Sequence, residues 1–423
     1  MVRIPHVDEA MLEAEYWIKH QGLTDQRLFT DEDRKRWHDQ WSREVPTCVD
    51  LSTFPEQLTN HQIASWIADD DHFSDVYYDL NNQPLEPTFW RKVRENCNKP
   101  EIGVTICAYA FTICRTAMRT LPTVVSAFKE GQAPRFDRLQ ETAIHMFEPV
   151  IILHRSRDGL FAYVQAQNYR GWVQNAHLAR TDRDTFSRHL KETSWVYVIG
   201  TNVEAVSSDR SVPIEYAGRL PLIATQSENL LVALPGQAQD GTYVAGQGRL
   251  ERGAGVSVGA LPCTRPNILR QAFRLLGEPY GWGDEYGLHD CSSFVMDVYR
   301  TIGLNLPRNA GEQEYLPGAG VAKTVYLRAW TASERYAALS HCQPGDLIYM
   351  PGHTMIYLGE IGDRRYVIHD FSGYAQLTED GTLHAVSVLQ VGVSPLELYL
   401  MSGATYLEAL TTTLSFHTTV ARS

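Results

Sequence analysis

One stretch near residue 290 constrains this chain most, because a glycine-rich approach runs directly into a cysteine and a helical pattern. Three glycines stand within residues 281–287, just before Asp290 and Cys291. Apolar residues then recur at helical spacing over residues 294–302, and Gly303 ends the pattern. The sequence therefore predicts a helix that starts at Cys291 and has Asp290 as its N-cap.

A cysteine in the first turn of a helix favours nucleophilic chemistry. Unpaired backbone N–H groups and the positive end of the helix dipole stabilise a thiolate, so we expect the pKa of Cys291 to be lowered. The alternative is a buried structural cysteine, since free cysteines are often buried. The chain has 7 cysteines and no CxxC pair, which argues against a zinc ribbon and leaves at least one thiol free.

Composition narrows the class of protein. With 423 residues, 43% of them hydrophobic and 21% charged, the chain is expected to be globular with several domains. A formal net charge of −12 argues against nucleic acid and anionic membranes as partners. No apolar run approaches the ~20 residues that cross a bilayer, and the first residues show no export signal.

The texture of the chain changes along its length. Residues 1–100 are polar and tryptophan-bearing, which is typical of helices and loops. Short apolar runs separated by Gly, Pro, Asn and Asp then indicate strands as far as residue 260. A weak repeat of one strand pattern predicts two small barrels, joined near residues 180–191.

Three strands with clear Pro-Gly and Gly punctuation are predicted after residue 344. If residues 353–358 and 364–369 form a hairpin about Ile361, His353 pairs with His369 and both side chains lie on one face. A slip of one residue would place the two histidines on opposite faces of the sheet.

These residue types suit a cysteine-nucleophile triad. Cys291 is the candidate nucleophile, His353 the base and later the acid, and His369 a neutral side chain that orients the imidazole of His353. The backbone N–H of Cys291 and the hydroxyl of Tyr280 are the candidate oxyanion donors. The alternatives are histidines with structural roles, or a zinc site that includes Asp370. We expect no metal and no cofactor.

Several motifs together resemble the NlpC-type family of papain-like cell-wall cysteine peptidases. The resemblance covers roughly residues 263–423. It is carried by Pro279-Tyr280-Gly281-Trp282-Gly283, Asp290-Cys291-Ser292-Ser293, Leu306-Pro307-Arg308, Pro344-Gly345-Asp346-Leu347 and residues 353–359.

The upstream strands resemble the bacterial SH3-like domains that precede this catalytic unit in γ-D-glutamyl-L-diamino acid endopeptidases. Residues 136–140 and 169–173 carry that likeness. The resemblance implies an α+β chain with a helical N-terminal domain at 1–100 and SH3-like barrels at 101–185 and 186–260. A papain-like peptidase domain at 261–423 completes the expected organisation.

The resemblance also implies a substrate and its binding residues. Such enzymes cut the bond between γ-D-glutamate and meso-diaminopimelate or lysine in peptidoglycan stem peptides. Relatives that accept only free stem peptides hold the amine of the leading L-alanine, and Glu148, Tyr169 and Asp290 match those positions. Ser292 and Tyr280 match positions that contact the substrate.

The sequence is compatible with three functions. The favoured one is a cysteine peptidase that acts on peptidoglycan or on free muropeptides, in lysis or in recycling. The others are a catalytically silent cell-wall-binding protein and an acyltransferase, because a thioester can be resolved by water or by an amine. We expect a monomer, located in the periplasm or cell envelope, with the cytoplasm as the alternative.

Overall fold

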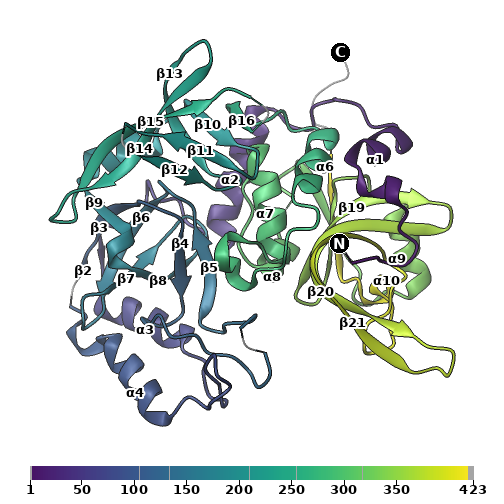
Figure 1. The fold of residues 1–423 in the computed structure, drawn as a ribbon, viewed down its shortest axis with the longest axis horizontal. Coiled ribbons are helices and arrows are strands. Elements are labelled where there is room, and N and C mark those ends of the chain that lie inside the picture. Colours follow the sequence, from purple (N-terminus) through teal and green to yellow (C-terminus); the bar gives the residue numbers. More distant parts are fainter. Residues whose placement is uncertain are drawn as a thin grey trace. The chain divides into compact units, whose positions relative to one another are not determined.

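The computed structural model describes residues 2–103, 105–132, 134–208, 210–253, 255–316 and 318–417. The chain divides into two compact units (Figure 1). Unit 1 consists of Met1–Pro46, Ala260–Tyr280 and Leu288–Ser423. Unit 2 consists of Thr47–Gly259 and Gly281–Gly287. No helix in the described part of the chain is long and apolar enough to cross a membrane.

The described residues of unit 1 form one antiparallel sheet in the order β17-β22-β18-β19-β20-β21. Helix α7 packs against β19 and β20. The strands are β17 (Ala322–Tyr326), β18 (Leu347–Met350), β19 (His353–Ile361), β20 (Arg364–Leu377), β21 (Leu383–Pro395) and β22 (Thr412–Phe416). The α-helices are α1 (Ala14–His20), α2 (Asp31–Glu44), α6 (Arg265–Arg274), α7 (Cys291–Thr301), α8 (Ala310–Glu314), α9 (Ala332–Leu339) and α10 (Tyr406–Ala409).

Unit 2 has two seven-stranded antiparallel sheets, one in each stretch where a barrel is predicted. The first contains β3 (Ala108–Thr112), β4 (Thr116–Arg119), β5 (Gln140–Ile144), β6 (Pro149–Arg155), β7 (Phe161–Gln165), β8 (Arg170–Gln174) and β9 (Leu178–Thr181). The second contains β10 (Trp195–Val198), β11 (Val203–Val206), β12 (Ser211–Ile214), β13 (Arg219–Thr225), β14 (Asn229–Gln237), β15 (Tyr243–Glu251) and β16 (Val256–Val258). The other elements include β1 (Gln57–Leu58), β2 (Thr105–Ile106), α3 (Asn60–Asp70), α4 (Pro87–Asn96) and α5 (Arg183–Leu190).

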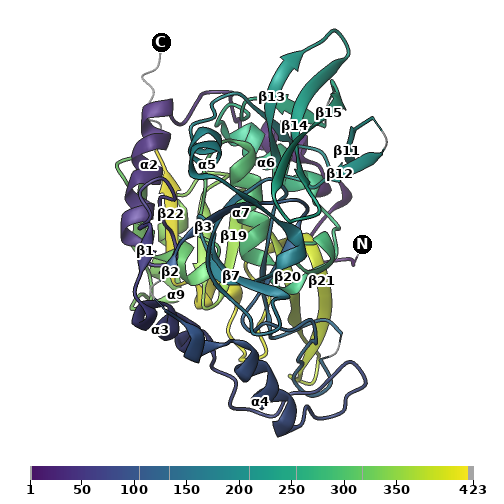
Figure 2. The same cartoon turned by 90° about the vertical axis from the view of Figure 1, so that its left-hand side faces the viewer.

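The helical region expected at residues 1–100 is divided between the two units near Pro46. Helix α2 lies beside β22, where Trp37 and Phe416 are 6.1 Å apart between ring centroids (Figure 2). The indole N–H of Trp37 also donates to the backbone oxygen of Asn305 at 2.9 Å. The buried tryptophans of α1 and α2 thus belong to the core of unit 1, which explains why this segment is not separate.

The hairpin of β19 and β20 forms, but in a different register from the expected one. Ile361 pairs with Arg364 at the turn, and a bulge between Tyr357 and Gly359 shifts the register by one residue. Beyond the bulge, Ile356 pairs with Ile368, which extends to Phe371, not His369, opposite His353. The predicted pairing is therefore wrong by two residues, and because side chains alternate, His353 and His369 still share a face.

The bulge is what keeps the histidines on the same face. Without it, the register of the turn would place Ser372 opposite His353 and Ile356 opposite His369, on opposite faces of the sheet. Gly359 has φ 117°, a backbone conformation that side chains with a Cβ rarely adopt, which is typical of a bulge position.

Candidate active site

The cysteine helix starts where the sequence predicts. Cys291 is the first residue of α7, and the Asp290 carboxylate accepts hydrogen bonds from the backbone N–H groups of Ser292 at 3.1 Å and Ser293 at 3.0 Å. The Ser293 hydroxyl accepts from the backbone N–H of Asp290 at 2.9 Å, which completes a capping box. This local network fixes the direction in which the chain enters the helix.

Arg308, which follows α7 in the chain, adds further hydrogen bonds to this network. No sequence pattern indicated this role. Its guanidinium donates to both carboxylate oxygens of Asp290, at 2.6 and 3.2 Å, and to the Ser292 hydroxyl at 2.8 Å. Burial raises the pKa of Asp290, but the charge and hydrogen bonds of Arg308 lower it below its ordinary value. Asp290 and Ser292, expected to bind substrate, are thus already engaged in holding the helix start.

His353 and His369 meet as the sequence analysis expects. The Nε2 atom of His353 lies 2.7 Å from Nδ1 of His369, and Nε2 of His369 lies 2.8 Å from the Ser394 hydroxyl. The His369 ring stacks on Phe371 with ring centroids 4.0 Å apart. Ser394 comes from β21, and no sequence pattern marked it. The chain of contacts leaves Nδ1 of His353 for a reacting group.

Both imidazoles are neutral at pH 7 in this arrangement. Burial lowers the pKa of His353 to about 4, against a smaller opposite effect of the Asp290 charge. Burial, followed by the proximity of His353, lowers the pKa of His369 well below its ordinary value. A neutral His369 fits the proposed orienting role, because it can fix which nitrogen of His353 carries the proton.

The expected lowering of the Cys291 pKa is wrong. The thiol is 8% exposed and donates to the backbone oxygen of Gly352, the residue before His353, at 3.9 Å. Burial, followed by the negative charge of Asp290, raises the pKa of Cys291 to about 12. The free site therefore holds a neutral thiol and a neutral imidazole, so a base has to remove the proton during attack.

This protonation state has a kinetic consequence. We expect the rate constant for alkylation of Cys291 by iodoacetamide to rise with pH through about pH 9, because only the thiolate reacts. The measurement is mass spectrometry of the peptide that contains Cys291 after timed exposure at a series of pH values. A rate that levels off below about pH 8 would instead indicate a preformed ion pair and contradict the prediction.

Tyr280 lies in electrostatic reach of Cys291. Burial, followed by the charge of Cys291, raises the pKa of Tyr280 well above its ordinary value, so its hydroxyl keeps its proton. The backbone of Tyr280 is fixed by donation to Leu389 at 3.0 Å and by a bridge to His289. A protonated, half-buried phenol is a hydrogen-bond donor suited to an oxyanion.

His289 is buried and contacts α7 through Asp297. Its ring nitrogens lie 2.5 Å from a carboxylate oxygen of Glu278 and 3.2 Å from one of Asp297. Burial alone lowers the pKa of His289, but hydrogen bonds to Asp297 and Glu278, and their charges, raise it to about 10. The side chain is therefore a structural cation.

A pH-dependent stability follows for His289. Protonated His289 stabilises the fold. This contribution to the free energy of unfolding is fully present below pH 6.5, the ordinary pKa, and is lost as pH rises through about 10. We expect the free energy of unfolding to fall between these two pH values more steeply in the wild type than in His289→Gln. Urea denaturation of both proteins across this range tests it, and parallel curves would contradict the prediction.

Two expected binding residues, Tyr169 and Glu148, lie in unit 2. The hydroxyl of Tyr169 donates to Glu141 at 2.5 Å. Glu148 instead pairs with Arg219, at 3.5 Å between Oε1 and Nε. Glu141, which lies on β5, was not singled out from the sequence, and no sequence pattern marked it.

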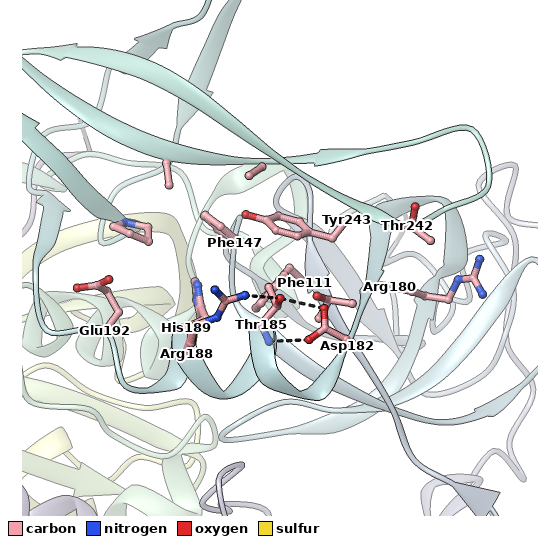
Figure 3. A pocket seen from close by; sticks show the side chains of 14 residues that line it. Phe111, Phe147, Arg180, Asp182, Thr185, Arg188, His189, Glu192, Thr242 and Tyr243 are labelled. Atoms are coloured by element: carbon pink, nitrogen blue, oxygen red, sulfur yellow. Dashed lines mark hydrogen bonds between the residues drawn. The ribbon is translucent and has the colours of Figure 1, made fainter.

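Unit 2 also contains a cavity of about 730 Å³ between α5 and the strands β14 and β15 (Figure 3). Phe111, Phe147 and Tyr243 line it together with Arg188 and His189 of α5. None of the expected site residues lines this cavity. Among the described residues, no group of three or more His, Cys, Asp and Glu side chains is arranged to hold a metal ion.

Known proteins resemble this chain in sequence and in fold. Gamma-D-glutamyl-L-lysine dipeptidyl-peptidase of Bacillus cereus is 23% identical over 248 residues, which span 52% of this chain and 65% of the relative. The enzyme of that name from Bacillus subtilis is 23% identical over 53% of this chain and 74% of its own length. An NlpC/P60 endopeptidase from Photobacterium damselae subsp. piscicida has the same fold, with a TM-score of 0.78, 16% identity and 98% coverage of both chains. An NlpC/P60 family protein from Bacillus cereus has a TM-score of 0.51 and 18% identity over 74% of this chain and 100% of its own.

Family models match two regions. One, described as SH3 domain (SH3b1 type), matches residues 123–174, within the first sheet of unit 2. The other matches residues 277–397, which contain Cys291, His353 and His369. The chain thus carries a domain of the NlpC/P60 family, preceded by an SH3 domain of the SH3b1 type.

Proposed function

We propose that this protein is a thiol peptidase that hydrolyses the γ-D-glutamyl–L-diamino acid bond of peptidoglycan stem peptides. The observation that carries the proposal is the connected set at one place in unit 1. Cys291 starts α7 beside Gly352, and His353 continues through His369 to Ser394. The names of the relatives support the choice of bond.

The chemistry proceeds in two balanced steps. Sγ of Cys291 attacks the γ-carbonyl carbon of D-glutamate while His353 accepts the thiol proton, and His353 then passes this proton to the departing amine of the diamino acid. Water attacks the resulting thioester while His353 takes a proton from it; the C–S bond then breaks, His353 returns the proton to the leaving sulfur, and the acid that forms ionises to the carboxylate in solvent. In both steps the backbone N–H of Cys291 and the Tyr280 hydroxyl stabilise the negative oxygen.

We propose that Tyr169 and Glu141, rather than Glu148, recognise the free amine of the leading L-alanine. Glu148 has a cationic partner in Arg219, whereas Glu141 is bonded to Tyr169 and to the Thr120 hydroxyl. A carboxylate that accepts hydrogen bonds from hydroxyls can also accept charge-assisted hydrogen bonds from an ammonium group.

Replacing each of the two acids in turn by glutamine tests this assignment. Glu141→Gln is expected to raise KM for the free tripeptide about 10- to 100-fold, because a hydrogen bond to a charged group contributes about 1.5–3 kcal/mol. A substrate acetylated on the L-alanine nitrogen should be cleaved equally by wild type and variant. Steady-state kinetics with Glu148→Gln as the control decides, and a larger KM effect in the control would reverse the assignment.

The function itself is tested by incubating the protein with L-alanyl-γ-D-glutamyl-meso-diaminopimelate and measuring the dipeptide released. Release of L-alanyl-γ-D-glutamate supports the peptidase, and its transfer to an added amine without hydrolysis would show an acyltransferase instead. Absence of both products would contradict the proposal. Purified sacculi assayed in parallel separate lysis from recycling, because a recycling enzyme cleaves the free tripeptide alone.

A further inference from the structure

The segment Gly281–Gly287 belongs to unit 2, although the residues that flank it in the chain, Tyr280 and Leu288, belong to unit 1. This segment connects the candidate oxyanion donor Tyr280 to the helix that starts at Cys291. It is therefore the link along the chain between the two reacting groups.

Strand β5 of the first sheet holds this segment by hydrogen bonds. The side-chain amide of Gln140 donates to the backbone oxygen of Gly283 at 2.8 Å. The hydroxyl of Thr142 and the backbone N–H of Ala143 donate to one carboxylate oxygen of Asp284, at 2.9 and 3.3 Å. Asp284 is 3% exposed and Thr142 is buried, so water does not readily replace these bonds.

Stacking adds to this attachment. The guanidinium of Arg138 lies 4.6 Å from the ring centre of Trp282, and Phe136 packs edge-on against the same indole at 5.8 Å. Trp282 and Asp284 are therefore both held by residues that lie within β5 or just before it.

The held conformation is one that the segment would not adopt without support. Gly283, Asp284 and Tyr286 have φ values of 57°, 65° and 59°, in the left-handed region. This region is uncommon for residues other than glycine, and such residues persist there when the surrounding structure holds them. A Cβ added at Gly283 would lie 2.7 Å from the backbone oxygen of Gln140, which shows how closely the strand and the segment approach.

We propose that Thr142 and Gln140 are positioning residues for the peptidase reaction, although they lie in the SH3-type domain and not in the NlpC/P60 domain. By fixing Gly283 and Asp284, they set the backbone that places Tyr280 and Cys291 for attack. This inference rests on the proposed function. A misplacement of about 1 Å in reacting groups can lower a rate about 10²-fold, so the effect is expected in kcat.

The experiment compares three substitutions of threonine in the same sheet. Thr142→Val removes the hydroxyl that donates to Asp284 and keeps the shape, and Thr142→Ser retains the hydroxyl. Thr116→Val is the matched control. Thr116 is a buried threonine on β4 of the same sheet, and its hydroxyl is hydrogen-bonded to His177 at 2.7 Å and not to the Gly281–Gly287 segment. The readouts are kcat and KM on the free tripeptide and the rate of alkylation of Cys291 by iodoacetamide.

We expect Thr142→Val to lower kcat about 10- to 100-fold with KM within about twofold, and Thr142→Ser and Thr116→Val to resemble the wild type. A specific change of kcat or of alkylation rate in Thr142→Val, restored in Thr142→Ser, supports the proposal. If both readouts in Thr142→Val match those in Thr116→Val, the proposal is overturned.

The test also covers a variant that does not fold and a wild type that does not cleave the tripeptide. If circular dichroism shows that Thr142→Val does not fold, Gln140→Met is judged by the same two readouts and the same criteria. If the wild type does not cleave the tripeptide, the proposed function fails, and the alkylation rate alone decides on the positioning role. An unchanged alkylation rate then overturns it.

Discussion

Replacing Cys291 with alanine is expected to abolish dipeptide release, with a fall in kcat of at least about 10⁴-fold, because the covalent route is lost entirely. Binding of the tripeptide should persist, since the helix start is held by Asp290 and Arg308 and not by the thiol. Chromatography of the released dipeptide measures the first effect, and isothermal titration calorimetry measures the second.

Cys114→Ala is the matched control for this substitution. Cys114 is a free, partly buried cysteine whose thiol pKa is also raised by burial, but it stands between β3 and β4 and not at a helix start. The control is expected to keep full activity. Undiminished release by Cys291→Ala would defeat the peptidase mechanism outright.

Replacing Arg308 with methionine is expected to lower the free energy of unfolding by about 3–5 kcal/mol, because it leaves the Asp290 carboxylate buried without its cation. Arg308 is 2% exposed and donates to both oxygens of Asp290. Urea denaturation monitored by tryptophan fluorescence gives the change in unfolding free energy.

Two comparisons isolate the cause of that loss. Asp290→Asn combined with Arg308→Met removes the stranded charge and keeps an N-cap, so the double variant is expected to recover part of the stability. Arg183→Met breaks an exposed pair with Glu56 and should cost under about 1 kcal/mol. A loss in Arg308→Met no larger than in Arg183→Met would contradict a buried ion pair.

The helix start and the meeting of the histidines could be predicted because both depend on patterns within short stretches. The N-cap Asp290 precedes Cys291 directly, and strand alternation carries His353 and His369 to the same face. The register could not be predicted correctly, because the bulge at Gly359 depends on one backbone conformation that sequence spacing does not reveal.

The rest of the candidate site depends on contacts between distant residues. Arg308 reaches Asp290 from beyond α7, and Ser394 reaches His369 from the next strand. The pKa of Cys291 was expected to fall because a helix start favours a thiolate, but the depth of burial and the charge of Asp290 have the opposite and larger effect. Neither burial nor an ion-pair partner is visible in a sequence motif.

The bulge between Tyr357 and Gly359 bears on how this hairpin tolerates insertions and deletions. Residues added at the Gly362-Asp363 turn leave the pairing beyond the bulge intact, so the imidazoles still touch. Loss of a single residue from β19 on the far side of Tyr357 would turn His353 away from His369, whatever the turn does. Aligning related hairpins by their turns alone would therefore misplace the residue that corresponds to His353, whereas aligning them on the bulge glycine, Gly359, would locate it.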